Sequence, residues 1–394
     1  MIKIVDKAKC CGCTSCSNVC PKQAIAMKPD EEGFLYPQVN SKLCIDCGLC
    51  DEVCPIKSGY EKFKSLEAFA ARYKDETILR NSTSGGVYTA LANIIINEGG
   101  IVYGAVYDKE FRVVHKRVSF PERDVSVFRG SKYVQSDLLK TFTEVKKDLK
   151  EGRKVLFSGT SCQIAGLNNF LKKQYVGLVT VEVICHGTPS PKLWKTYLDY
   201  QESKYKSKIA KVTFRNKTYG YHSGTMEIVF KNGKKYYGSN RVDYMLKSFF
   251  GEIASRPSCY ECVCKGLERP ADLSIYDCWH AAQLLHIKDD DKGYTNILVN
   301  TEEGRRLLKN SVGYLSLQAV DINQAIKLDG IMIEEYPYKH PYREIFYSEL
   351  DKLGIKNTVS KLIGVTKKDY FIESSKGILY KMGLFKLIKK LSKG

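Results

Sequence analysis

The sequence contains no long apolar segment and no recognisable export signal. No run approaches the roughly 18 consecutive apolar residues that a membrane span requires. Residues 1–9 lead directly into a cysteine run, without the apolar stretch of a signal peptide. Fifteen cysteines in such a chain favour metal ligation in a reducing compartment over disulfide bonds. We therefore expect a cytoplasmic protein.

Acidic residues are in short supply as well. The chain of 394 residues has 44 Asp and Glu against 62 Lys and Arg, which gives a formal net charge of +18. A basic surface suits nucleic acid, anionic lipid, or an acidic cofactor or redox partner, and charge alone does not choose between them. The hydrophobic content of 43% is enough for a large core, and the length suggests two or three domains.

Eight of the cysteines form two copies of one pattern, C-x2-C-x2-C-x3-C-P. The second copy lies 34 positions after the first (44 − 10). The first copy is Cys10, Cys13, Cys16 and Cys20 with Pro21, and the second is Cys44, Cys47, Cys50 and Cys54 with Pro55. This spacing is typical of bacterial ferredoxins with two 4Fe–4S clusters, in which the fourth cysteine of each run binds the other cluster.

The spacing therefore predicts two metal centres with crossed ligands in a ferredoxin domain at residues 1–57. One cluster is expected on Cys10, Cys13, Cys16 and Cys54, and the other on Cys44, Cys47, Cys50 and Cys20. A pair of zinc knuckles or a disulfide framework is the alternative interpretation, but zinc sites rarely use this double run. Cys11 disturbs neither run and is interpreted as a spare thiol.

Beyond residue 66 the pattern changes to alternating strands and helices. Helical stretches separate strand-like segments, which are expected at 67–73, 101–108, 111–118 and 154–160 and within 176–190. Such alternation indicates a parallel sheet with sites at the carboxyl ends of its strands, where Cys162 and Cys185 both fall. Later segments at 211–217, 225–230 and 234–238 are expected to form antiparallel strands, with Asn232-Gly233 as a hairpin turn.

Several short motifs follow one another in a recognisable order. The stretch from about Leu66 to about Leu308 resembles the coenzyme F420 hydrogenase/dehydrogenase beta-subunit family. The motifs that carry the resemblance are Arg80 with Ser84-Gly85-Gly86, Gly130-Ser131-Lys132-Tyr133, Gly159-Thr160-Ser161-Cys162-Gln163-Ile164, Cys185-His186-Gly187 with Pro189-Ser190, Phe214-Arg215-Asn216-Lys217, Cys259 with Cys262, and Arg269-Pro270-Ala271-Asp272 leading to Asp277 and Trp279. Each motif is short, and the match is specific because all of them occur in order.

The resemblance implies a flavoprotein that binds FAD and passes electrons between iron–sulfur clusters and a two-electron partner. That partner is coenzyme F420 in the name-giving members. Ser84, Gly85, Gly86, Lys132 and Tyr133 are implied to contact the flavin or its phosphates. A lysine beside a helix N-terminus suits a pyrophosphate, although an ordinary loop is the alternative for Lys132 and Tyr133.

The expected fold class is α+β, with the ferredoxin domain followed by an α/β flavin-binding domain and an antiparallel β-containing C-terminal part. The implied boundaries are 1–57 for the ferredoxin domain, 66–205 and 206–345 for the N-terminal-like and C-terminal-like domains of the F420 hydrogenase beta subunit, and 346–394 for a basic helical tail.

A third 4Fe–4S cluster is inferred for Cys162, Cys185, Cys259 and Cys262. Two of these cysteines fall at neighbouring strand ends, and the other two form a C-x2-C pair. Cys264 is a rival ligand, and ordinary buried thiols are the alternative for the first two.

One motif departs from the family. Relatives usually have Gly-Asp-Phe-Trp-Gly where this chain has Tyr276-Asp277-Cys278-Trp279-His280, so the substrate is in doubt. His186, Cys278 and His280 are the candidate catalytic residues, as proton donors or relays. His186 could instead orient the neighbouring ligand Cys185, and Cys278 and His280 could instead be spare metal ligands. For Cys278 and His280, plain packing is the alternative.

The tail combines apolar and basic side chains at helical spacing. The apolar positions are Ile378, Leu379, Met382, Phe385, Leu387, Ile388 and Leu391, and the lysines are Lys376, Lys381, Lys386, Lys389, Lys390 and Lys393. This composition suits a helix on an anionic membrane surface, or a terminal helix docked on the protein. Specific nucleic-acid binding is not expected, because no reading motif accompanies the charge.

These features together predict a cytoplasmic iron–sulfur flavoenzyme, which the basic tail could hold peripherally on the inner face of the cell membrane. A ferredoxin-like or other one-electron partner would exchange electrons with the clusters, and a small-molecule acceptor would react at the flavin. Two alternatives stay open. One is an electron-transfer subunit without its own substrate, and the other is a membrane-associated redox accessory of surface-polysaccharide biosynthesis.

Overall fold

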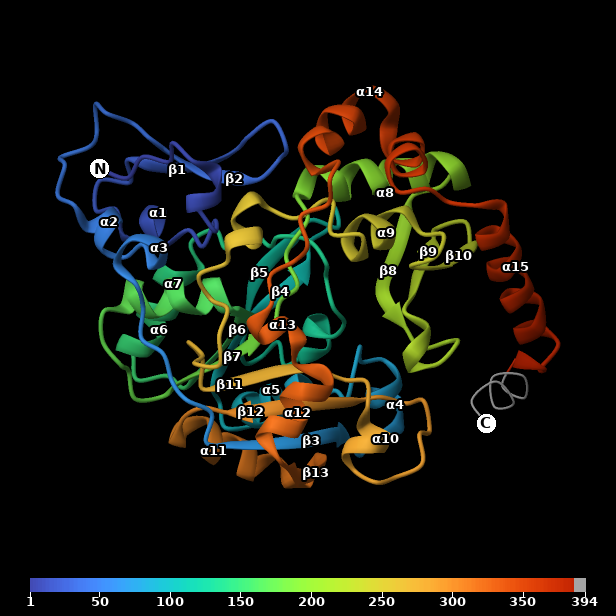
Figure 1. Cartoon of the computed structure of the whole chain (residues 1–394). Helices are drawn as coiled ribbons and strands as arrows, with labels where there is room; N and C mark the ends of the chain where they lie inside the picture. Colours follow the sequence, from blue (N-terminus) through green and yellow to red (C-terminus); the bar gives the residue numbers. More distant parts are fainter. Residues whose placement is uncertain (386–394) are drawn as a thin grey trace. The chain divides into compact units, whose positions relative to one another are not determined.

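The computed structural model describes residues 1–385, which form two compact units (Figure 1). The first unit combines Met1–Pro191 with Ser255–Tyr338, and the second combines Lys192–Ala254 with the described residues from 339 to 385. These boundaries differ from the four consecutive segments expected from the sequence. The difference arises because the chain leaves the first unit after Pro191 and returns at Ser255 to add further strands to the same sheet.

The first 58 residues of the first unit form a small ferredoxin-like part. Strands β1 (Ile25–Pro29) and β2 (Leu35–Val39) pair as an antiparallel hairpin. The short helices α1 (Ser15–Val19), α2 (Leu49–Glu52) and α3 (Pro55–Ser58) carry or adjoin the cysteine runs. Three cysteines, Cys16, Cys50 and Cys54, pack in one apolar cluster with Ile2 and Ile25.

An eight-stranded sheet forms the body of the first unit (Figure 1). Its order is β13-β3-β12-β11-β7-β6-β4-β5. The strands are β3 (Glu67–Tyr73), β4 (Ile101–Tyr107), β5 (Val113–Val118), β6 (Val155–Thr160), β7 (Leu178–Val183), β11 (Leu273–Cys278), β12 (Tyr294–Val299) and β13 (Leu315–Val320). The pairs β4–β6, β6–β7 and β7–β11 are parallel and the outer pairs antiparallel, so the sheet is mixed.

Helices cover both faces of this sheet. On one face α5 (Val87–Asn97) packs against Ala71, Val102 and Ile297 in a large apolar core. On the other face α6 (Thr141–Lys150) and α7 (Ser161–Leu171) pack against Tyr103 and Phe157. The short helices α10 (Ala281–Leu284), α12 (Ile322–Asp329) and α13 (Ile331–Glu334) cover the same second face farther along the sheet. The remaining helices of the unit are α4 (Glu76–Arg80) and α11 (Glu302–Lys309).

The second unit is built on a separate three-stranded antiparallel sheet. Its strands β8 (Ile209–Asn216), β9 (Thr225–Phe230) and β10 (Lys235–Ser239) follow the order β10-β9-β8, and the expected Asn232-Gly233 turn joins two of them. Gly233 has φ +81°, a left-handed conformation that suits a hairpin turn. The helices are α8 (Pro191–Tyr205), α9 (Tyr244–Phe250), α14 (Arg343–Leu362) and α15 (Lys367–Lys381).

Helix α15 is docked on this unit by one side only. Glu373 accepts hydrogen bonds from Ser239, and the Lys376 ammonium lies 4.3 Å from the Tyr219 ring centroid. Ile378 and Met382, which belong to the expected apolar face, are 59% and 62% exposed. Lys386, Leu387, Ile388, Lys389, Lys390, Leu391 and Lys393 lie outside the described residues. Contact of this tail with a membrane therefore stays a prediction.

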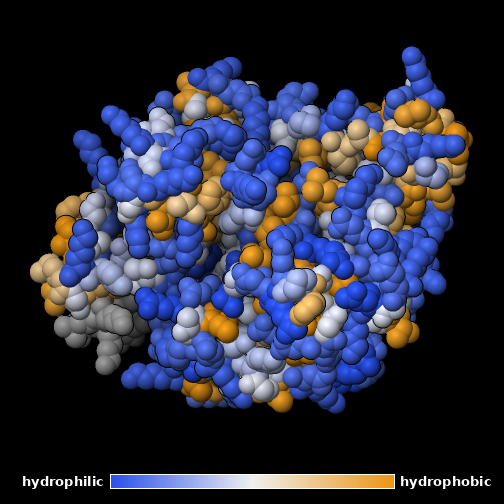
Figure 2. All heavy atoms as spheres, turned by 180° about the vertical axis from the view of Figure 1, so that it is seen from behind, coloured by the Kyte–Doolittle hydropathy of each residue, from blue (hydrophilic) through white to orange (hydrophobic). Residues whose placement is uncertain are grey.

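No helix within the described part of the chain is both long enough and apolar enough to cross a membrane. Seen from behind, the surface is predominantly hydrophilic, with separate apolar patches (Figure 2).

Candidate iron–sulfur and flavin site

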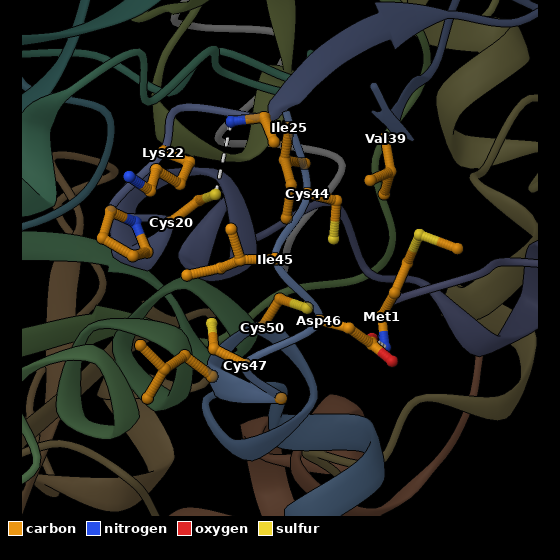
Figure 3. A pocket seen from close by; sticks show the side chains of 14 residues that line it. Met1, Cys20, Lys22, Ile25, Val39, Cys44, Ile45, Asp46, Cys47 and Cys50 are labelled. Atoms are coloured by element: carbon orange, nitrogen blue, oxygen red, sulfur yellow. Dashed lines mark hydrogen bonds and ion pairs between the residues drawn. The ribbon is translucent and has the colours of Figure 1, made fainter. Parts of the chain in front are cut away.

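The fourth cysteine of the first run, Cys20, lies beside the first three cysteines of the second run. One pocket is lined by Cys20, Cys44, Cys47 and Cys50, and Figure 3 shows these side chains around a common space. This cysteine set, which lines what we call the second-run pocket, is the crossed set predicted from the spacing.

A separate pocket contains the complementary set. This pocket, which we call the first-run pocket, is lined by Cys10, Cys13, Cys16 and Cys54, together with Cys11 and apolar side chains. In the second-run pocket, backbone N–H groups point at cysteine sulfurs, with Ile2 N donating to Cys50 Sγ at 3.2 Å and Ala24 N to Cys20 Sγ at 3.3 Å. Donors of this kind favour thiolates and are among the features that tune iron–sulfur clusters.

Soft thiolate donors are the ligands that iron–sulfur clusters require, so both pockets fit the predicted groups. The cysteines surround a space and do not converge on one point. Among residues 1–385, no three His, Cys, Asp or Glu side chains come together closely enough to hold a single metal ion.

The four cysteines predicted for a third cluster come from three places in the chain. Cys162 follows β6 and Cys185 follows β7, and these strands are parallel neighbours with Thr160 paired to Val183. Cys259 lies in the short 3-10 helix Pro257–Glu261 and Cys262 directly follows it. Burial and the nearby Cys185, Cys262 and Cys162 thiols raise the pKa of Cys259, so the four groups are close enough to interact.

A buried ion pair supports this third cysteine group. Arg269 is 2% exposed and forms two hydrogen bonds with the Glu182 carboxylate, at 2.7 and 3.0 Å. The same guanidinium donates to Ser161 Oγ, next to Cys162, and to the carbonyl of Cys264. The pair thus connects the ends of β6 and β7 with the returning segment that carries the C-x2-C pair. Cys264 is 2% exposed and hydrogen-bonds to Cys262, which leaves its role as a rival ligand open.

Cys11 lies between the first-run pocket and the third cysteine group. The pKa of its thiol is raised by a hydrogen bond with Cys13, which has the largest effect, by a hydrogen bond with Cys162, and by burial. Interpreting Cys11 as a spare thiol misses this contact, because it joins residues 151 positions apart (162 − 11) and leaves no trace in the local spacing.

Helices α1 and α7 approach closely at a glycine. Ser15 Oγ donates to the Gly166 carbonyl at 2.7 Å. A Cβ on Gly166 would lie 2.6 Å from Ser15 Oγ and 2.9 Å from Cys13 Sγ. Gly166 therefore allows the helix that begins beside Cys162 to pack directly on the first cysteine run.

Replacing Gly166 with valine should force these helices apart. Overpacking of this kind costs about 1–3 kcal/mol. We expect that loss in the free energy of unfolding, measured by anaerobic denaturant titration, together with a changed electron paramagnetic resonance (EPR) signal of the first-run cluster. Gly313→Val is the matched control, because a Cβ there meets nothing within 4 Å. Equal stability of the two variants would contradict the close approach.

The two segments implied to bind flavin lie together. Ser131 N donates to Thr83 Oγ1 at 2.7 Å, which joins the loop of Lys132 to the turn that precedes α5. Ser84 Oγ donates to the Tyr294 carbonyl, and Gly85 N donates to Thr295 Oγ1 at 2.8 Å. The turn is thereby fixed against β12, at the N-terminus of an eleven-residue helix.

Packing alone accounts for part of the glycine pattern. A Cβ on Gly85 would lie 2.2 Å from the Ala71 carbonyl oxygen, so no larger residue fits there. Gly86 has φ +79°, which favours glycine. Neither requirement needs a phosphate, so the role of these residues in flavin binding stays a prediction.

Lys132 turns its ammonium back onto its own loop. The Nζ donates to the carbonyls of Phe128, Arg129 and Gly130 at 3.1–3.3 Å. Burial lowers the pKa of Lys132 to about 7, while these carbonyls favour the charged form. Tyr133 follows in the same half-buried loop.

Of the three candidate catalytic residues, Cys278 and His280 share a contact with Asp329. His186 follows Cys185 after β7. Cys278 is 1% exposed in an apolar cluster with Ala281 and Leu284, and burial raises the pKa of its thiol. His280 is half exposed, and its Nδ1 lies 2.7 Å from Asp329 Oδ1. Cys278 faces α10 and α12, on the sheet face opposite α5. Catalytic roles for all three stay predictions.

Comparison with known families supports both halves of the sequence interpretation. Residues 152–324 match the C-terminal region of the family described as "Coenzyme F420 hydrogenase/dehydrogenase, beta subunit", and residues 9–58 match "4Fe-4S dicluster domain". Residues 152–324 are thus similar to the C-terminal region of coenzyme F420 hydrogenase/dehydrogenase beta subunits. The F420 beta-subunit match includes Cys162, Cys185, Cys259 and Cys262, and the dicluster match includes both cysteine runs.

Several known proteins are similar to this chain over different lengths. "Uncharacterized protein MJ1349" of Methanocaldococcus jannaschii is 25% identical, over 83% of this chain and 94% of that protein. "Coenzyme F420-dependent sulfite reductase" of the same organism is 26% identical, over 84% of this chain and 48% of its own length. One of the subunits of the F(420)H(2) dehydrogenase of Methanosarcina mazei is 22% identical, over 41% of this chain and 48% of that polypeptide. The chain thus spans about half the length of the last two.

A solved structure of the F420-reducing [NiFe] hydrogenase complex from Methanosarcina barkeri contains a chain with 19% identity and a TM-score of 0.45. The match covers 69% of this chain and 89% of that one. The dicluster domain and the F420-related relatives together identify an iron–sulfur redox protein.

Proposed function

We propose that this F420 beta-subunit relative is an iron–sulfur flavoprotein oxidoreductase. It exchanges single electrons with an external partner at the ferredoxin-like part and transfers two electrons to a small organic acceptor beside FAD. FAD, when bound, supplies the exchange between one-electron and two-electron chemistry. Coenzyme F420 is the candidate two-electron partner suggested by the relatives' names.

The observation that carries the proposal is the loop from Ser131 to Gln135, which contacts the candidate flavin turn at one end and the first cysteine run at the other. Ser131 N hydrogen-bonds to Thr83 in the candidate flavin turn, and Gln135 Nε2 donates to the Cys11 carbonyl at 3.2 Å. Four residue steps separate Ser131 from Gln135, so their backbones lie within about 14 Å of each other even if fully extended. A flavin at the turn would therefore lie near the first cysteine run, which favours direct electron transfer between them.

The cysteine contacts suggest how electrons would travel through the protein. The second-run pocket includes Cys47, which is exposed and suits exchange with an external partner. The first-run pocket is linked through Cys11 to Cys162 of the third cysteine group. We infer a route from the second-run pocket to the first-run pocket and then to the third group.

Metal and flavin analysis of anaerobically prepared protein tests this function. Three clusters and one flavin predict about 12 irons and one FAD per chain, whereas the ferredoxin pair alone predicts about 8 irons. Lys132→Gln should lose flavin and keep iron, because a cationic side chain beside a helix N-terminus favours a pyrophosphate. Colourless protein with zinc in place of iron would refute the proposal, and iron without flavin would refute its flavin half.

The second candidate is an electron-transfer subunit without its own substrate. It is favoured by the similarity to one of the subunits of F(420)H(2) dehydrogenase, since a subunit is by definition part of a larger enzyme. The same preparation separates the candidates. A lone polypeptide that reduces a two-electron acceptor supports the enzyme, and a stable complex whose isolated chain is inactive supports the subunit.

A further inference from the structure

Arg256 is a buried cation in contact with the first cysteine run. Its side chain is 1% exposed, and its Nε donates to the Cys10 carbonyl at 2.7 Å. Its Nη2 lies 3.6 Å from Cys10 Sγ and donates to the Leu35 carbonyl at 3.0 Å. The guanidinium also stacks 4.1 Å from the Tyr36 ring centroid. Arg256 thus touches a sulfur that is predicted to bind iron.

This guanidinium has only neutral partners among the described residues. Its remaining Nη1 donates to the amide oxygen of Gln135 at 3.0 Å, and no carboxylate of residues 1–385 pairs with it. A buried charge without an opposite charge is strongly unfavourable, so buried cations normally have an anionic partner. A 4Fe–4S cluster with four thiolates carries net negative charge and would supply that partner beside Cys10.

The second-run pocket lacks an equivalent contact. In the part of the chain that the structure describes, Cys20 and Cys50 accept only neutral backbone N–H donors, from Ala24 and Ile2. Its lining includes the Asp46 carboxylate and Lys22, and the Met1 amino group is itself paired with Asp46 at 2.9 Å. The charges around this pocket therefore offset one another in large part, whereas the first-run pocket has a buried positive charge.

We infer that Arg256 raises the reduction potential of the cluster on Cys10, Cys13, Cys16 and Cys54 above that of the cluster on Cys44, Cys47, Cys50 and Cys20. A positive charge stabilises the reduced, more negative form more than the oxidised form, and hydrogen bonds to the sulfurs act in the same direction. With both clusters bound, one electron would pass from the reduced second-run cluster to the oxidised first-run cluster, without a change in any bond or proton.

The backbone contacts of Arg256 indicate toward which neighbouring site this difference in reduction potential would favour electron transfer. Its backbone N donates to the Thr188 carbonyl at 3.0 Å, and its carbonyl accepts from Cys259 N at 2.9 Å. Arg256 therefore belongs to the segment that carries the third cysteine group, while its side chain reaches the first run. Electrons would then be held preferentially at the first-run pocket, which Cys11 joins to Cys162. The inference rests on cluster binding in the proposed function.

The test is an anaerobic redox titration of the loaded protein, followed by EPR spectroscopy. Arg256→Gln removes the charge, and Arg256→Lys retains it. Cys47→Ser alters only the second-run signal and so assigns the two clusters. We expect Arg256→Gln to shift the electron distribution between the two clusters at least tenfold away from the first-run cluster, which is 59 mV for a one-electron couple. Arg256→Lys should restore most of the difference.

Lys9→Gln is the matched control. It removes a positive charge adjacent to Cys10, but the Lys9 side chain is 59% exposed and pairs with Glu261 at the surface, so solvent screens it. The control should shift the potential much less than Arg256→Gln.

Unchanged potentials in Arg256→Gln, at full iron content, would overturn the inference. Should that variant fail to load, the native protein still decides, because a first-run cluster with the lower potential also overturns it. Iron and flavin counts on the same samples distinguish these outcomes from failure of the proposed function.

Discussion

Replacing Cys20 with serine is expected to remove the cluster of the second cysteine run, 24 positions away (44 − 20). Cys20 lines the pocket of Cys44, Cys47 and Cys50, whereas Cys54 lines the pocket of Cys10. Loss of one thiolate should cost the whole cluster, so iron content should fall by about 4 per chain. Anaerobic iron and sulfide analysis measures this loss directly.

Paired replacements test the crossed arrangement itself. Cys20→Ser with Cys44→Ser changes two ligands of one predicted cluster and should again cost about 4 irons, whereas Cys20→Ser with Cys10→Ser affects both clusters and should cost about 8. The reverse result would show that each run binds its own cluster. Cys11→Ser is the control, because Cys11 is not a predicted ligand, and its iron content should equal that of the native chain.

The second large effect is expected at the buried ion pair of Arg269 and Glu182. Arg269→Met leaves the Glu182 carboxylate, which is fully buried, without its partner. Breaking a buried pair in this way costs about 3–5 kcal/mol. We expect that loss in the free energy of unfolding, measured by anaerobic denaturant titration. If the proposed third cluster is bound, its iron should also be lost, because Arg269 connects Ser161 with the Cys264 carbonyl.

An exposed pair provides the comparison. Arg306 and Glu303 lie on the surface of α11, with side chains 65% and 50% exposed, so Arg306→Met should change stability by less than about 0.5 kcal/mol. The double replacement of Arg269 with methionine and Glu182 with leucine should recover part of the loss, since no charge is then left buried. An Arg269→Met variant that loses little free energy of unfolding and keeps all its iron would refute the supporting role of the pair.

Local patterns in the sequence were sufficient for the ferredoxin-like part and for most strands. The spacing of the eight cysteines predicted which of them share a pocket, because cluster geometry restricts short loops tightly. The parallel strand ends that carry Cys162 and Cys185 followed from the alternation of strands and helices. In each case the information lies within a few neighbouring residues.

Contacts between distant segments could not be predicted in this way. The Cys11–Cys162 contact depends on the packing of α1 against α7, and Arg256 reaches Cys10 across 246 positions. The return of Ser255 to the first unit was also missed, because neither composition nor periodicity marks which sheet a strand joins. The Arg256 side chain, three residues before Cys259, is the one local signal that could have drawn notice.

The first unit is built from two separate segments of the chain, and this order determines when the third cysteine group can assemble during synthesis. Cys162 and Cys185 leave the ribosome first, and 73 further residues must follow before Cys259 emerges (258 − 185). The strand β11, which pairs with β7 and holds the returning segment in position, comes later still. The proposed third cluster would therefore have to be inserted after most of the polypeptide has been made, whereas the two ferredoxin-like pockets could be filled on a nascent chain.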